Sequence, residues 1–286
     1  MKKSNPEITQ IPVQGTNTTT IEARNDKAPF NNLQVREALQ EAINLPEIAQ
    51  TYYQGNCSPY PCSVQSMYMA GWGLGLYPTW PSELKATYDY NVAGAKALLT
   101  AAGYPNGFTT DCVATSTSLW DTPLLEVAQS EFAQIGVTMS IRQMDYGSWV
   151  HYVKETHSAD ALSYGHSSYG ASYEPIFSLG LFVTNDGGNV SMISDPKVDA
   201  IYARTVNATS GTDFKQAVYD MDLYVAQQHF STVLATPNTT ALAQPWLVGY
   251  NGQAFAADFV VGAPLYGGFY LSRFWINQNL KASMGH

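Results

Sequence analysis

One stretch, YDYNVAGAKALLTAAGYPNGF at residues 88–108, decides the fold because it reads as a complete helix followed by a strand. Asp89 and Asn91 each offer a side-chain oxygen to the free amides of a first helical turn. Gly103 can adopt the left-handed conformation that closes the last turn, and Asn106-Gly107 is a turn dipeptide that leads into a strand. The helix is expected to bury one apolar stripe, consisting of Ala93, Ala97, Leu98 and Ala101.

Helices and strands alternate on both sides of this stretch. Apolar residues at helical spacing predict helices near 33–43, 121–134, 196–206 and 213–228. Extended runs predict strands near 8–13, 18–23, 109–114, 137–144, 159–164, 233–236 and 240–243. Residues 54–83 are expected to form a long loop. The order of elements indicates an α/β fold with a parallel or mixed sheet, because helices connect successive strands.

Composition limits the classes of protein and partner. Of the 286 residues, 45% are apolar and 13% are charged, and the formal net charge is -9. The low charge density argues against disorder, and the negative sign argues against nucleic acid as a partner. The chain contains neither a run of about 18 apolar residues nor a signal-like apolar start. It therefore reads either as a cytosolic protein or as an internal piece of a longer secreted one.

Few residues indicate catalysis or metal binding. Gly165-His166-Ser167-Ser168-Tyr169 approaches the G-x-S-x-G nucleophile elbow, but Tyr169 occupies the final glycine position. The five histidines show no zinc spacing, and the glycines at 71–75 lack the pattern of a phosphate loop, so neither a metal nor a cofactor is expected. Cys57 and Cys62 are close enough for a disulfide, although two loop thiols would have the same spacing. Cys112 is expected to be a buried, inert thiol.

Four blocks together resemble the extracytoplasmic solute-binding proteins of family 5, the dipeptide, oligopeptide and nickel binding components of ABC importers. They are NDKAPFNNLQVREALQEAIN at 25–44, the stretch at 88–108, GVTMSIRQMDYGSWVHYV at 136–153 and SDPKVDAIYA at 194–203. The resemblance implies an α/β lobe of the type II periplasmic-binding-protein fold, with a mixed sheet flanked by helices, as a fragment of a two-lobed protein. Residues 1–24 would lead from a missing N-terminal lobe, 25–235 would form the C-terminal lobe, and 236–286 would return toward the N-terminal lobe.

The resemblance also implies a function. Such a protein holds a small-molecule or peptide ligand between its lobes, delivers it to a membrane-embedded ABC permease, and performs no catalysis. It is expected to be a monomer, periplasmic or lipid-anchored at the cell surface, with its leader outside this sequence. Arg36, Asp145 and Asp195 recur in or beside the matching blocks, and their positions suggest helix capping or surface pairing.

The resemblance places the segment after the strand at 159–164 in the ligand cleft. Peptide-binding members carry a GW.AD-like sequence there, whose aspartate pairs with the ligand's amino group, but this chain has GHSSYGASYEP at 165–175. Unless Glu174 replaces that aspartate, the site is neutral and suits uncharged polar solutes such as sugars; otherwise it suits peptide-like ligands. A hydrolase or a ligand-sensing regulator that reuses the lobe is the alternative. The predicted ligand-binding residues are Tyr164, His166, Ser167, Ser168, Tyr169, Ser172, Tyr173 and Glu174.

Overall fold

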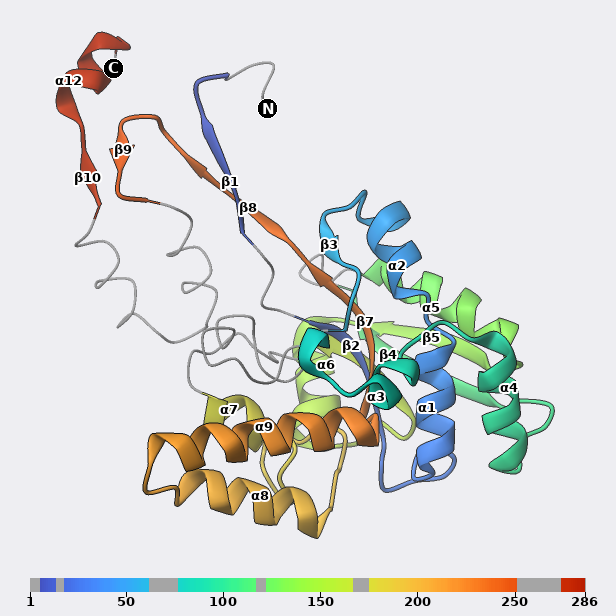
Figure 1. Cartoon of the computed structure of the whole chain (residues 1–286). Helices are drawn as coiled ribbons and strands as arrows, with labels where there is room; N and C mark the ends of the chain where they lie inside the picture. Colours follow the sequence, from blue (N-terminus) through green and yellow to red (C-terminus); the bar gives the residue numbers. More distant parts are fainter. Residues whose placement is uncertain are drawn as a thin grey trace.

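A six-stranded mixed sheet flanked by helices forms the body of the molecule, and a second, smaller group of strands extends away from it (Figure 1). The computed structural model describes residues 6–13, 18–61, 77–116, 122–166, 175–250 and 274–285. At residues 12, 13, 165, 166 and 239 only the backbone is described.

The described part of the chain contains the following elements. The strands are β1 Thr9–Val13, β2 Thr19–Ala23, β3 Cys57–Ser58, β4 Thr109–Thr115, β5 Thr138–Met144, β6 Leu162–His166, β7 Ser231–Pro237, β8 Thr239–Ala243, β9 Leu247–Val248 and β10 Trp275–Ile276. The α-helices are α1 Leu33–Glu41, α2 Leu45–Glu47, α3 Ser82–Ala86, α4 Val92–Ala101, α5 Thr122–Gln134, α6 Tyr146–Trp149, α7 Pro175–Gly180, α8 Pro196–Val206, α9 Gly211–Gln228 and α12 Gln278–Ser283. Two π-helices, Ile48–Tyr52 and Val150–Glu155, and a 3₁₀-helix, Tyr77–Thr79, complete the list.

The large sheet has the strand order β3-β7-β2-β6-β4-β5. Strand β4 runs parallel to both β5 and β6, whereas β2 runs antiparallel to both β6 and β7. The prediction of a parallel or mixed sheet is therefore confirmed as a mixed one. The long loop expected at 54–83 is interrupted, because β3 pairs with the outer edge of β7 and α3 begins at Ser82.

Each face of the sheet packs against different helices. Cys112 and Ala114 of β4 belong to the main core with α1, α4 and α5, whereas Val113 between them packs against Trp149 and Val153 on the opposite face. This alternation follows from the two-residue period of a strand. Helices α7, α8 and α9 bury a separate core that includes Phe182, Val198, Val218 and Met221. The burial of Cys112 in the main core is as expected.

The predicted helix within residues 88–108 forms as α4, but it buries a different stripe. Gly103 takes the expected left-handed conformation, with φ of 93°. The buried residues of α4 are Ala95 and Leu99, while Ala93, Ala97 and Ala101 are exposed and Leu98 is half-buried. The predicted stripe was wrong because α4 is apolar on several faces, so that contact with α1, rather than periodicity, selects the buried one.

Capping was predicted more accurately than packing. Asn32 accepts a hydrogen bond from the Gln34 amide at 2.9 Å, and Asp145 and Asp195 cap α6 and α8 as expected. The surface role expected for Arg36 was wrong. Its side chain is buried, and its guanidinium donates to the carbonyl oxygens of Phe30 and Gln228.

The two cap candidates before α4 can be separated by mutation. Asn91 Oδ1 accepts from the Gly94 amide at 2.9 Å, whereas Asp89 is exposed and makes no such bond in the described structure. We expect Asn91→Ala to lower the free energy of unfolding by about 1 kcal/mol, and Asp89→Ala to change it by clearly less. Urea unfolding followed by circular dichroism measures both variants, and equal losses would contradict the assignment of the cap to Asn91.

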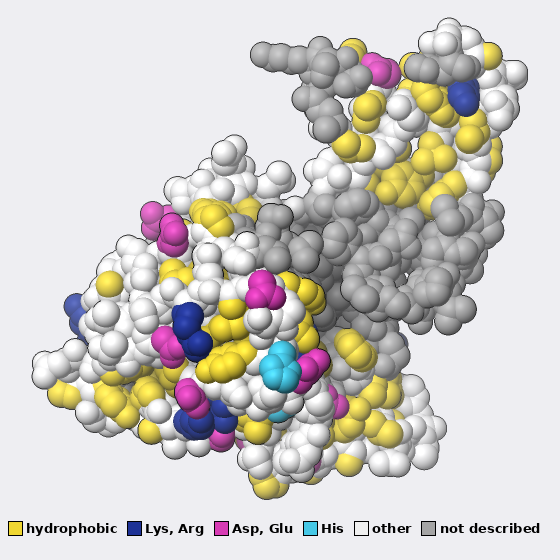
Figure 2. All heavy atoms as spheres, turned by 180° about the vertical axis from the view of Figure 1, so that it is seen from behind, with side chains coloured by type: hydrophobic (Ala, Val, Ile, Leu, Met, Phe, Trp, Pro, Cys, Tyr) yellow, Lys and Arg dark blue, Asp and Glu magenta, His cyan; other side chains and the backbone are white. Residues whose placement is uncertain are grey.

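Strands β1 and β8 form an antiparallel ribbon that leaves the large sheet, with Thr9 opposite Ala243 and Val13 opposite Thr239. Strands β9 and β10 also pair, and α12 follows β10 (Figure 1). We call β1, β8, β9, β10 and α12 the arm. Figure 2 shows hydrophobic side chains gathered on the arm, where Leu242, Trp275, Ile276 and Leu280 are exposed. No helix in the described ranges is both long and apolar enough to cross a membrane.

Candidate functional site

The sheet topology favours a ligand site at the carboxyl ends of the neighbouring strands β4 and β6. The chain leaves β4 through α5 toward β5 on one side, whereas it leaves β6 through α7, α8 and α9 toward β7 on the other side. Adjacent parallel strands whose connections depart in opposite directions form a topological switch point, and ligands of open α/β sheets bind outside the carboxyl ends of such strands. The segment predicted to bind ligand, which starts at Gly165, begins at the carboxyl end of β6.

Most of the predicted ligand-binding residues lie outside the described residues: Ser167, Ser168, Tyr169, Ser172, Tyr173 and Glu174. The backbone of His166 belongs to β6 and pairs with Thr19 of β2. Tyr164 is buried in the main core, with 1% of its surface exposed. The structure thus locates the start of the segment, and the binding roles of these eight residues stay predictions.

Buried hydroxyl and carboxylate groups lie on β2 beside the switch point. Thr20 pairs with Gly165 of β6, and the Thr20 hydroxyl donates to Glu22 Oε1 at 2.6 Å. The Ser191 hydroxyl donates to the other Glu22 oxygen, also at 2.6 Å. These groups were not predicted as site residues, although the repeated threonines of TNTTTIEA at 16–23 were a visible signal. The bond between Thr20 and Glu22 lies within one strand, whereas the bond from Ser191 depends on a turn that is distant in sequence, which no local pattern specifies.

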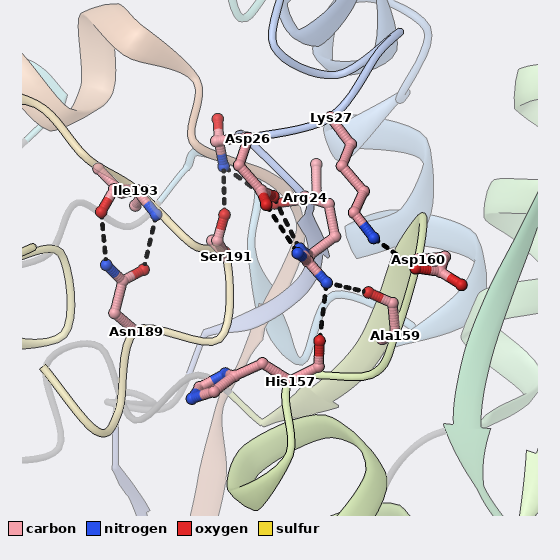
Figure 3. Close-up of polar contacts among 11 residues, drawn as sticks. Arg24, Asp26, Lys27, His157, Ala159, Asp160, Asn189, Ser191 and Ile193 are labelled. Atoms are coloured by element: carbon pink, nitrogen blue, oxygen red, sulfur yellow. Dashed lines mark hydrogen bonds and ion pairs between the residues drawn. The ribbon is translucent and has the colours of Figure 1, made fainter. Parts of the chain in front are cut away.

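Arg24, which directly follows β2, fixes the position of the chain just before β6. Its Nη1 donates to the carbonyl oxygens of His157 and Ala159 at 2.8 and 2.6 Å, while the guanidinium also forms a two-point ion pair with Asp26 (Figure 3). Hydrogen bonding to Arg24 lowers the pKa of Asp26, and Asp26 in turn raises the pKa of Arg24. Because the guanidinium bonds the chain just before β6, it holds this strand against β2.

The chain beyond the predicted ligand segment is also attached to β2 and to the residues that follow it. Asn189 folds a turn by bonding both the amide and the carbonyl of Ile193, at 3.0 and 2.8 Å (Figure 3). The carbonyl of Ser191 in this turn accepts from the amide of Asn25 at 2.9 Å. Both ends of the segment that contains residues 167–174 are therefore anchored to β2 or to the residues directly after it.

The predicted disulfide remains a prediction because Cys62 lies outside the described residues. Cys57 is buried in β3, where its Sγ lies 3.4 Å from the Ser58 carbonyl oxygen, and burial raises the pKa of its thiol to about 11. Within the described ranges, no three His, Cys, Asp or Glu side chains come together in a way that could hold a metal ion.

Comparison with known proteins identifies the family. Residues 1–189 match the family described as bacterial extracellular solute-binding proteins, family 5 Middle. This match covers more than half of the chain, which therefore belongs to the family 5 solute-binding proteins.

The alignments with individual relatives include most of this chain but only part of each relative. Heme-binding protein A of Haemophilus influenzae is 25% identical over 93% of this chain and 47% of its own length. Glutathione-binding protein GsiB of Pectobacterium atrosepticum is 29% identical over 67% of this chain and 36% of its own. The crystal structure of Haemophilus influenzae OppA in complex with RPPGFSPFR shares the fold, with a TM-score of 0.70 and 17% identity over 96% of this chain and 51% of that one. The chain thus spans between about a third and a half of the length of these three proteins.

Proposed function

We propose that this chain forms the C-terminal lobe of an extracytoplasmic protein that binds a solute and delivers it to an ABC permease. The observation that carries this proposal is the family match, on a fold whose switch point coincides with the start of the predicted ligand segment. On this view the protein is a monomer in the periplasm or anchored at the cell surface by lipid. It binds neither nucleic acid nor a cofactor, and it performs no catalysis.

The arm supports the proposed division of the chain. Residues 25–235 would form most of the lobe, to which β2 adds a central strand of the sheet, while the remaining parts of 1–24 and 236–286 would contain the connections to an N-terminal lobe. The β1–β8 ribbon contains one strand from each of the two connections, and it leads away from the large sheet. The arm also exposes the apolar side chains of Trp275, Ile276 and Leu280. Such side chains in one region favour burial against another protein surface, and the N-terminal lobe is the surface proposed here.

For the ligand we propose a peptide-like solute. GsiB is named for glutathione, the OppA structure contains a peptide, and heme-binding protein A is named for heme. These names favour solutes with ionised groups over sugars, which none of the three names mentions. In this proposal Glu174 supplies the negative charge for the ligand's ammonium group, since the chain has no aspartate at the position where the family pattern carries one.

The charge at Glu174 can be tested with paired ligands. The protein is titrated with glutathione and with short peptides, each with a free or an acetylated amino terminus, while tryptophan fluorescence is recorded. We expect Glu174→Gln to weaken binding of the free-amine ligands by about 10- to 100-fold, because a charge-assisted hydrogen bond is lost, and to leave the acetylated ligands unchanged. Glu83→Gln, at an exposed position of α3, serves as the control.

Other outcomes of the titration discriminate among the functions. Binding of oligosaccharides alone would overturn the peptide proposal and favour a neutral solute. Mass spectrometry of the ligands after incubation tests the hydrolase alternative, which predicts cleavage products. A ligand-sensing regulator would respond to the ligand by changing its affinity for DNA, and a filter-binding assay measures that response.

A further inference from the structure

Two buried carboxyl groups flank the short connection between α1 and α2. Glu41 is the last residue of α1 and Glu131 lies on α5, and each is 8% exposed. Between them run Ala42 and Ile43, which are fully buried, and Asn44, whose side chain caps α2. We call residues 41–44 together with Glu131 the α1–α2 junction.

Each carboxyl group packs against a neighbouring helix. The Glu41 carboxylate lies against the first turn of α4, so close to Gly94 that a Cβ added there would approach Oε2 to 2.5 Å. The carbonyl oxygen of Glu41 also accepts from the Asn91 amide at 2.8 Å. Glu131 Oε1 accepts from the Asn44 amide at 3.3 Å, which connects α5 to the start of α2. The junction therefore holds α1, α2, α4 and α5 together.

Neither group has the partners that a buried negative charge requires. Among the described residues, Oε2 of Glu41 and Oε2 of Glu131 accept no hydrogen bond, and neither residue forms an ion pair. The charged groups that face them are also negative: Glu37 and Asp89 around Glu41, and Glu47 around Glu131. Burial and these neighbours raise the pKa of both groups to about 7, although the Asn44 amide acts in the opposite direction on Glu131.

We propose that the α1–α2 junction is a proton-dependent latch. Neutral Glu41 and Glu131 keep helices α1, α2, α4 and α5 closely packed, and ionisation of the two groups loosens this packing. A protonated carboxyl group stays buried at much lower cost than a charged one, and a buried charge without an ion-pair partner favours local opening toward water. The latch depends only on the described helices and not on the proposed ligand or transport role.

The sign of the pH dependence follows from the direction of the two shifts. The folded protein keeps both protons between pH 4.5 and about 7, where the unfolded chain has lost them. Stability from these groups is therefore complete below pH 4.5 and is lost as the pH rises to about 7. His229 opposes this trend, because burial and the nearby Arg36 lower its pKa to about 3, which makes folding less favourable toward acid pH. Because His229 is present in both the variants and the wild type, its contribution to the pH dependence cancels when the two are compared.

Charge-neutral variants test the latch. We expect Glu41→Gln together with Glu131→Gln to raise the thermal midpoint by several degrees at pH 8 and to leave it nearly unchanged at pH 4.5, relative to the wild type. Hydrogen exchange of the amides at 42–53 should slow at pH 8 in the double variant. Glu126→Gln, at an exposed position of the same helix as Glu131, should change neither quantity.

Two results would overturn the latch. One is a midpoint difference of the same size at both pH values, which would indicate a packing effect of the amide groups. The other comes from the wild type and does not depend on folding of the variants: carbon NMR that shows both glutamates titrating near pH 4.5.

Discussion

Replacement of Gly107 by alanine is expected to destabilise this protein by about 4 kcal/mol or more. Gly107 has φ of 73°, and a Cβ at this position would lie 1.9 Å from the carbonyl oxygen of Gly136 and 2.3 Å from its carbon. Both are backbone atoms, so no side-chain rotation can relieve the clash. Because Gly107 and Gly136 precede the parallel strands β4 and β5, the alanine would push apart the start of this strand pair.

Gly103→Ala is the matched control for this prediction. Gly103 is also left-handed, with φ of 93°, but a Cβ there would meet no atom within 4 Å. Its replacement should therefore cost only the backbone strain of about 1–2 kcal/mol. Urea unfolding followed by circular dichroism measures both variants. Similar losses for the two would show that the close approach of Gly107 to Gly136 has no energetic importance.

Arg36→Met is expected to cost about 2–5 kcal/mol, because it leaves one buried and one partly buried acceptor without their donor. The guanidinium is the donor to the Phe30 carbonyl at 2.8 Å and to the Gln228 carbonyl at 2.9 Å, and it lies 5.5 Å from the centre of the Phe230 ring. Burial lowers its pKa to about 10, so the arginine stays charged at neutral pH. One side chain thus joins the segment before α1 to the end of α9.

Two further variants show whether the buried hydrogen bonds cause this loss. Arg36→Lys should recover only part of the stability, because one ammonium group lacks the planar geometry needed to reach both carbonyls. Arg204→Ala removes an arginine of α8 whose side chain is 42% exposed and pairs with Asp213 and Asp220 at the surface, and it should cost less than about 1 kcal/mol. Thermal unfolding that ranked Arg204→Ala equal to Arg36→Met would contradict this explanation.

The features that could be predicted well from the sequence, such as helix caps, depend on residues that are close together in the chain. Asn91, Asp145 and Asp195 cap their helices because the donor and the acceptor lie within three positions of each other. The buried stripe of α4 and the burial of Arg36 were predicted wrongly, because contacts with distant helices decide them. Strand β3 was missed since only two residues, Cys57 and Ser58, pair with the edge of β7.

The same distinction applies to the candidate site. The resemblance predicts a ligand segment at the end of a strand, and the sheet order gives an independent physical reason to expect a ligand there, while the binding roles of its residues stay predictions. The hydrogen bond from Ser191 to Glu22 was not predictable, because Ser191 is 169 positions from Glu22 and reaches it only through the turn after α7.

The central position of β2 has a consequence for synthesis of the protein on the ribosome. This strand emerges before both of its neighbours in the sheet, so one of its edges must wait for β6 and the other for β7. Thr18 meets its hydroxyl partner Thr236 across 218 positions of chain. Until β7 has been synthesised, β2 therefore has an open edge that can pair with other chains. Protection of the nascent β2 by a chaperone, until β7 has left the exit tunnel, would prevent such aggregation.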